Sequence, residues 1–403
     1  MSEGNLTLLR RVSIGSESST IYSTPGAYTH VRGLENLSYS FPREALADNR
    51  HLTSRRGQNA SHLGAKAPEM GFRVPIHNAI FTDLDTVFTS AFGTKSANTF
   101  VWSAGAAGTV TKSSGSFDPI VLVTISAVTH ARPVKSVASN VATLAIQGGG
   151  ANTTAKNAAT DSGALYYQDP TAAYTSMALE MDASGESDHI KYTMAGAVPD
   201  QVTLSLDLEQ RLGLDLHFMG GDFTINTAAN ITNPSALSGQ QLGFQAECFI
   251  QDIGTPAAGT QIDLHSLEAN LCWRWIARKA TRAVAATLVG SAIVGWKQEL
   301  WCPDGVKVTV TKQSTTWTTA RTNKTAYGLF VSWSLGGPGD TAAANKVALW
   351  IPRVVLDADP VEVDIDGIAG YELQFKVEEE SALSSDDGSD IVTQGALAFF
   401  KAA

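Results

Sequence analysis

The stretch QVTLSLDLEQRLGLDLHFMGG, residues 201–221, decides the fold class. Apolar and polar residues alternate in two runs, which Glu209, Gln210 and Arg211 separate. The apolar positions are Val202, Leu204, Leu206, Leu208, Leu212, Leu214, Leu216 and Phe218. A period of two is that of a half-buried strand, so the stretch predicts a β-hairpin with one apolar face.

Other strand patterns follow along the chain, at 119–128, 141–147, 306–313, 371–377 and 395–400. Residues 326–352 predict two strands around a Gly-Pro-Gly turn. Strands do not alternate regularly with helices, which argues against a parallel α/β fold. The sequence therefore predicts an all-β fold with few helices.

One helix is expected, in HNAIFTDLDTVFTSAFG at 77–93. Its apolar residues recur every three or four positions, with Asn78 placed to cap the start and Gly93 the end. The stripe comprises Ile80, Phe81, Leu84, Val87, Phe88, Ala91 and Phe92. We interpret it as core; the alternative is a docking face for a neighbouring subunit.

The length of 403 residues suits two domains. Residues 224–240 have the composition of a linker. We predict an arm at 1–24, a first domain at 25–225, a linker at 226–242 and a second domain at 243–403. The first domain should carry a long loop insertion at about 100–185, where Ala, Gly, Ser and Thr dominate and where 147–163 is predicted to be loop.

Charge is distributed unevenly. The net charge is −10, and residues 357–390 hold twelve acids against one base, Lys376. The first 73 residues hold nine Lys or Arg and six acids. An acidic balance argues against wrapping nucleic acid, although nucleic acid can still pass nearby.

The sequence predicts no enzyme, cofactor or metal. The eight histidines lack zinc spacing, GGPGD at 336–340 lacks the Lys of a phosphate loop, and QGGG at 147–150 lacks a strand-to-helix context. Three cysteines, Cys248, Cys272 and Cys302, have no paired spacing and should be buried free thiols. The apolar run 283–296 is short for a membrane span, so we expect a core element and no membrane partner.

Two alternatives stay open. The acidic segments at 357–367 and 384–391 do not match a calcium loop, and a solvated surface or a glycosidase pair are the other interpretations. A β-sandwich carbohydrate-binding module of a virion or secreted protein would use tryptophans as a sugar platform. Its candidates are Trp273, Trp275, Trp301, Trp317, Trp333 and Trp350.

Three stretches together resemble the tail tube, or major tail, proteins of long-tailed bacteriophages. They are the N-terminal RGLENLSYSFPREALADNR, the central HIKYTMAGAVPDQVTLSLDLEQRLGLDLHFMGGDF and the C-terminal NKVALWIPRVVLDADPVEVDIDGIAGYELQFKV. The closing GALAFF is also similar. The resemblance lies in pattern and order, and it covers most of 37–400.

The resemblance implies two tandem tail-tube-like β-sandwich or barrel domains, each contributing strands to a lumen-lining β-barrel. Rings form by sheets joining edge to edge, as trimers with pseudo-sixfold symmetry, and stack head to tail. Genome DNA passes through without specific binding. Tape measure, tail tip and connector proteins are further partners, in a virion tail assembled in the host cytoplasm. The hairpin would turn polar residues toward water: Thr203, Ser205, Asp207, Asp215 and His217.

The charge asymmetry supplies the candidate site. Successive rings in a head-to-tail stack present different surfaces, which must be complementary. We expect Arg43, Arg50, Arg55 and Arg56 to meet acids of the next ring. The acid candidates are Asp357, Asp359, Glu378, Glu379 and Glu380. The rival assignment places these acids on the lumen wall, where they would repel DNA.

Overall fold

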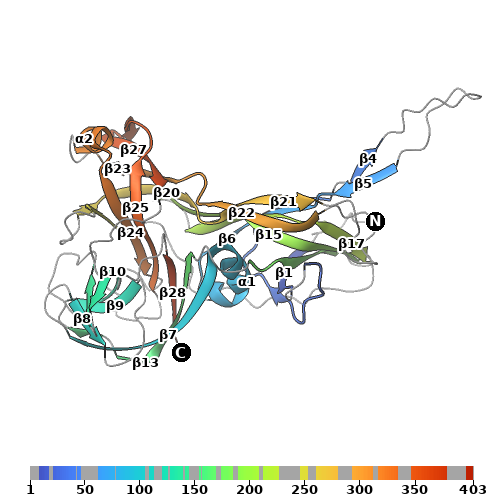
Figure 1. The fold of residues 1–403 in the computed structure, drawn as a ribbon, viewed down its shortest axis with the longest axis horizontal. Helices are drawn as coiled ribbons and strands as arrows, with labels where there is room; N and C mark the ends of the chain where they lie inside the picture. The colour runs from blue at the N-terminus through green and yellow to red at the C-terminus, as the bar shows by residue number, and fades with distance from the viewer. Residues whose placement is uncertain are drawn as a thin grey trace, which may run out of the picture.

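The computed structural model describes most of the chain between Leu9 and Ala402. The described ranges are 9–17, 21–41, 43–46, 62–77, 79–104, 109–112, 120–125, 128–138, 141–144, 154–155, 157–168, 174–184, 189–207, 212–226, 246–252, 260–279, 293–311, 316–334, 346–378 and 396–402. Antiparallel strands dominate them, with two helices, so the all-β prediction is confirmed (Figure 1).

The first half of the chain supplies a set of ten strands and one helix, which we name the first repeat. Its strands are β1 (Leu9–Ser16), β2 (Thr29–His30), β3 (Glu35–Ser40), β4 (Arg43–Leu46), β5 (His62–Lys66), β6 (Glu69–Pro75), β14 (Met177–Ser184), β15 (His189–Asp207), β16 (Gly213–Met219) and β17 (Asp222–Asn226). Its helix is α1 (Ile80–Phe92).

The second half supplies the second repeat. Its strands are β18 (Ala246–Asp252), β19 (Thr260–Ile262), β20 (Leu264–Asn270), β21 (Trp273–Lys279), β22 (Ile293–Trp301), β23 (Val306–Thr311), β24 (Ala326–Ser334), β25 (Lys346–Leu356), β26 (Val361–Ile365), β27 (Ile368–Val377) and β28 (Ala396–Ala402). Its helix is α2 (Thr316–Asn323).

The same strand pairings occur in both repeats, in the same chain order. β1 pairs with β2 and β14, as β18 pairs with β19 and β24. In the first repeat, β15 pairs with β14, β16 and β17. In the second repeat, β25 and β26 together take the place of β15: β25 pairs with β24 and β28, and β26 pairs with β27. β6 lies between β3 and β16, as β23 lies between β20 and β27. Each repeat also has a separate hairpin, β4–β5 or β21–β22.

An insertion lies between α1 and β14. It contains β7 (Gly93–Ala104), β8 (Thr109–Lys112), β9 (Ile120–Ile125), β10 (Val128–Ala138), β11 (Val141–Leu144), β12 (Thr154–Ala155) and β13 (Asn157–Gln168). The expected loop at 147–163 is therefore wrong for 154–155 and 157–163. β13 pairs with β7 and with the distant β28, so long-range pairing overrides the low apolar content of this stretch.

Helix α1 packs into the core, as predicted. Leu84, Val87, Phe88 and Phe92 are fully buried, and the Phe88 ring lies 5.1 Å from that of Tyr166. The helix begins at Ile80 with Ala79 at its N-cap, so the prediction that Asn78 caps it is wrong. The imidazole Nδ1 of His77 instead accepts a hydrogen bond from the Ala79 amide.

The domain limits predicted from composition stay a prediction. Most of the expected linker falls in 227–245, which lies outside the described residues. The two repeats nevertheless share one continuous core and one continuous sheet.

Candidate functional site

One antiparallel sheet runs through both repeats in the order β3–β6–β16–β15–β20–β23–β27–β26, and we name it the central sheet. Its two halves meet at the pairing of β15 with β20, which we name the seam. There Leu206 lies opposite Leu267, Ser205 opposite Glu268 and Thr203 opposite Asn270. The seam joins the last central-sheet strand of the first repeat to the first central-sheet strand of the second.

The end of the seam is held by Asn270. Its side-chain oxygen accepts a hydrogen bond from the Val202 amide at 3.1 Å, and its amide nitrogen donates to Asp304 at 3.2 Å. The backbone amide of Leu271 also donates to the Val202 carbonyl at 2.9 Å. These buried polar groups are satisfied across the boundary between the repeats, so the seam is a specific joint.

One face of the central sheet is apolar and forms the core. Alternate residues of the six inner central strands lie there, as the period-two pattern predicts. The buried set includes Val202, Leu204, Leu206, Leu214, Leu216, Phe218, Leu267, Val306, Val308, Leu373 and Phe375. The apolar face predicted for the hairpin at 201–219 is therefore confirmed. Its first strand ends at Asp207 and its second begins at Gly213.

The opposite face of the sheet is polar over the inner strands, whereas its β26–β27 edge exposes Val361 and Ile368. Arg73 donates to the Ser205 hydroxyl and to the Asp215 carboxylate, each at 2.9 Å, and so links β6, β15 and β16. Gly213 leaves room for this guanidinium, because an added Cβ would lie 2.8 Å from its Nε. Hydrogen bonding to Asp200, at 2.6 Å, raises the pKa of His217 above its usual value.

Carboxylates outnumber cations on the polar face. The acids are Glu35, Glu69, Asp215, Glu268 and Glu372, and the bases are Arg73, Lys307 and Lys376. Two hollows lie on this face near the seam, of about 450 and 350 Å³. Thr203 lines the larger one but is only 4% exposed, so its predicted orientation to open water is wrong. The side chain of Asp207 lies outside the described part.

The predicted charge site is described only in part. Arg50, Arg55, Arg56, Glu379 and Glu380 lie outside the described residues, and Arg43 is placed by its backbone in β4. Asp359 is 3.9 Å from Arg321, and Glu378 is 3.3 Å from Arg353. The backbone amide of Asp357 pairs with Gln374. In Figure 1, β4–β5 and β27 lie at opposite ends of the molecule, so the structure does not bring these groups together within one chain.

Other sequence expectations can be placed as well. The three cysteines are free and buried, as predicted. All six platform tryptophans are at most 8% exposed, so in the described structure they do not form an exposed sugar platform. Within the described ranges we find no cluster of metal-ligating side chains, and none of the helices there has the length and apolar character needed to cross a membrane.

Sequence reasoning missed the contacts that bind the second repeat to the first. The carbonyl of Gly196 accepts from the Trp296 indole of the second repeat at 2.8 Å, while its amide donates to Glu17 within the first repeat. Burial raises the pKa of Glu17, and Tyr22 donates its hydroxyl proton to the Ile293 carbonyl at 2.7 Å. The partners are separated by 100 residues or more, so their spacing carries no local signal. Neither the protein-family models nor the curated proteins searched contain a match to this chain.

Proposed function

We propose that this chain is a structural subunit of a phage tail tube, without catalytic activity. Copies assemble into rings, which stack head to tail into a hollow conduit for genome DNA in a virion tail. The observation that carries the proposal is the seam, where one chain already joins two equivalent four-stranded units edge to edge.

The free edges of the central sheet support assembly. Among the described strands, β3 pairs only with β6 and β26 only with β27. Open edges are a liability that proteins usually cover. In a ring, β26 of one copy pairs with β3 of the next, just as β15 pairs with β20 inside the chain. Three copies then give a trimer with pseudo-sixfold symmetry, because each chain supplies two equivalent units.

The register of this joint follows from the repeat. Gly213 and Gly370 hold the same place, opposite the last residues of β6 and β23. Ser205 pairs with Gly213 and Val363 with Gly370, so Ser205 and Val363 correspond. Ser38 and Glu268 correspond in the same way. Since Ser205 faces Glu268 at the seam, Val363 should face Ser38 of the next copy.

The polar face suits the lumen wall. Its excess of carboxylates repels DNA phosphates, so the genome slides past without binding. The core behind it fixes the wall through the alternation of the strands. Tape measure, tail tip and connector proteins are the partners that such a tube requires.

Electron microscopy of the purified protein at high concentration tests the function. We expect rings, and stacks of rings with a central channel. Monodisperse particles at every concentration would overturn the proposal.

A further inference from the structure

The hairpin β21–β22 closes one side of the first repeat. Trp273, Trp275, Trp296 and Trp301 are buried in the shared core. The Trp275 ring packs edge-on against Tyr174, with centroids 5.2 Å apart, and the Tyr174 hydroxyl accepts from the Trp296 amide at 2.9 Å. Figure 1 shows the hairpin lying across β15, so an element of the second repeat covers its neighbour.

The hairpin β4–β5 holds the same place in the first repeat, between β3 and β6. Ala45 pairs with Leu63 as Trp275 pairs with Gln298, so Ala45 corresponds to Trp275. Figure 1 shows β4–β5 projecting beyond the body at the end opposite β27 and α2. Within its own chain it therefore does not reach the end of the second repeat that carries β27 and α2.

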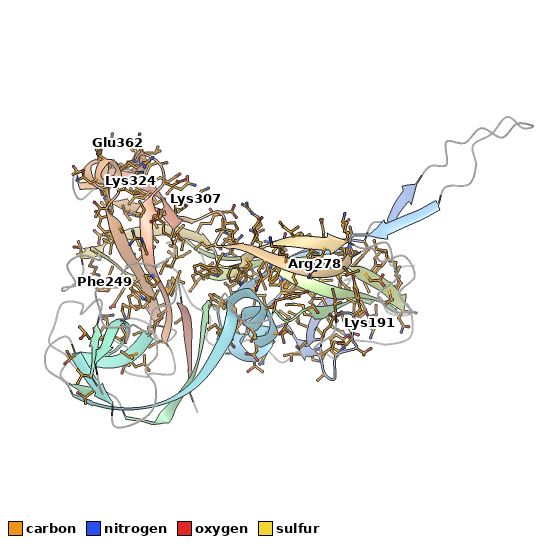
Figure 2. All side chains as sticks on the ribbon, in the orientation of Figure 1. Lys191, Phe249, Arg278, Lys307, Lys324 and Glu362 are labelled. Carbon is orange, nitrogen blue, oxygen red and sulfur yellow. The ribbon has the colours of Figure 1, made fainter. Side chains whose placement is uncertain are left out.

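The second repeat offers a surface equivalent to the one that β21–β22 covers. The amide of Gly221 donates to Ala195 at 3.0 Å, and that of Glu378 donates to Arg353 at 3.1 Å, at matching positions. Val354 thus corresponds to Gly196, the acceptor of the Trp296 indole. By the register of β24 with β25, Asn323 at the end of α2 corresponds to Tyr174. Figure 2 places Lys324, the next residue, on the end of the molecule farthest from β4–β5.

We propose that β4–β5 of each copy docks on the second repeat of the ring neighbour whose β26 pairs with its own β3, against the end of α2, the start of β24 and the Arg353–Glu378 edge. The partner is a second copy of this chain, and the inference rests on the proposed ring. Each β4–β5 hairpin would reinforce the edge pairing beside it, as β21–β22 reinforces the seam.

Charge complementarity supports this occupant. Residues 43–66 contain five bases, Arg43, Arg50, Arg55, Arg56 and Lys66, against two acids. The receiving end of the chain holds the acids Asp357, Asp359 and Glu378, followed in sequence by Glu379 and Glu380. Its bases are Arg321, Lys324 and Arg353, of which Arg321 lies near Asp359 and Arg353 near Glu378, so acids exceed bases by five to three. The expected meeting of Arg and acid thus occurs between neighbours within a ring rather than between stacked rings.

Photo-crosslinking on single rings tests the docking. A benzophenone amino acid replaces Ala45 in one variant and Leu46 in another, because adjacent strand residues point to opposite faces and one of them must face the receptor. Rings are built from a mixture of nitrogen-14 and nitrogen-15 copies. The matched control carries the probe at Trp275, where crosslinks should join Tyr174 and its neighbours within one chain.

The expected result is a crosslink between differently labelled copies, from position 45 or 46 to the segments around Asn323–Ala326 or Arg353–Glu378. Crosslinks confined to one copy, or landing on other surfaces while rings persist, would overturn the docking and leave the proposed function intact. If no rings form in the unmodified protein, both proposals fail together.

Discussion

The two repeats share every pairing of the central sheet but differ in what covers them. The first repeat is closed by β21–β22, which the second repeat supplies within the same chain. The counterpart β4–β5 extends away from the body (Figure 1). The seam between the repeats is therefore paired and covered within the chain. The equivalent edge strands β3 and β26 and the hairpin β4–β5 have no such counterpart among the described residues of the chain. This asymmetry is what a head-to-tail ring requires, because every copy must both give and receive.

The helices differ as well, because α1 is more deeply buried than α2. A single substitution in α1 tests this difference. Phe88→Asp in α1 places an unpaired carboxylate in the core and should cost several kcal/mol, about the scale for a buried charge without a partner. Thermal unfolding measures it. Thr82→Asp is the control, because Thr82 is exposed in the first turn, where the helix dipole favours an acid. A Phe88→Asp protein that keeps its melting temperature and still assembles would show that α1 is neither core nor interface.

The seam should make both repeats unfold together. Leu267 is 1% exposed opposite Leu206, so Leu267→Ala should cost about 2–4 kcal/mol through lost burial and a cavity. Calorimetry should show one transition that shifts as a whole. Ser266→Ala on the polar face of the same strand is the control and should change stability by less than about 0.5 kcal/mol. Two separate transitions would mean that the repeats are independent units.

One pH effect should arise in the first repeat, at His77. Burial lowers the pKa of His77 from 6.5 to about 4. The folded state then binds fewer protons than the unfolded chain, so the contribution is complete above pH 6.5 and is lost as the pH falls toward 4. At about 1.4 kcal/mol per pKa unit, the loss is on the order of 3 kcal/mol.

The control for this effect is His77→Asn. An Asn oxygen can still accept from the Ala79 amide but does not titrate. Chemical denaturation at several pH values should give curves for wild type and variant that diverge below pH 6.5, the usual His value. Parallel curves would mean that His77 is protonated in the folded protein. The second repeat has Gln313 two residues after β23, where the first has His77 after β6.

The smallest effect on assembly is expected from the arginines of the segment 43–66. Exposed ion pairs contribute about 0–1 kcal/mol each and are screened by salt. Replacing Arg43, Arg50, Arg55 and Arg56 together by Ser should weaken single rings at low salt, measured by analytical ultracentrifugation, if the arm docks within the ring. Intact rings that no longer stack would favour contact between rings. Unchanged growth of tubes would assign the acids to the lumen or the outer surface.

The sequence predicted local structure well where one face is buried. The hairpin at 201–219 and helix α1 both carry strong periodicity, and both form. It failed at 157–163, where Ala, Gly, Ser and Thr form a strand because β7 and β28 pair with it from far away. The seam was also out of reach, since β15 and β20 read as ordinary alternating strands. Which strand pairs with which is a tertiary property that alternation does not encode.

The most direct test of the central claim is a disulfide across the proposed joint. Ser38→Cys and Val363→Cys are combined in one chain, where six strands separate β3 from β26. The three native cysteines are buried and should not interfere. Directly opposite strand residues lie at a Cα separation that suits a disulfide. Under mild oxidation, the account predicts covalent dimers and closed trimers on a non-reducing gel, with each single variant remaining monomeric. Double-variant chains that form rings but remain uncrosslinked would contradict the pairing of β26 with β3.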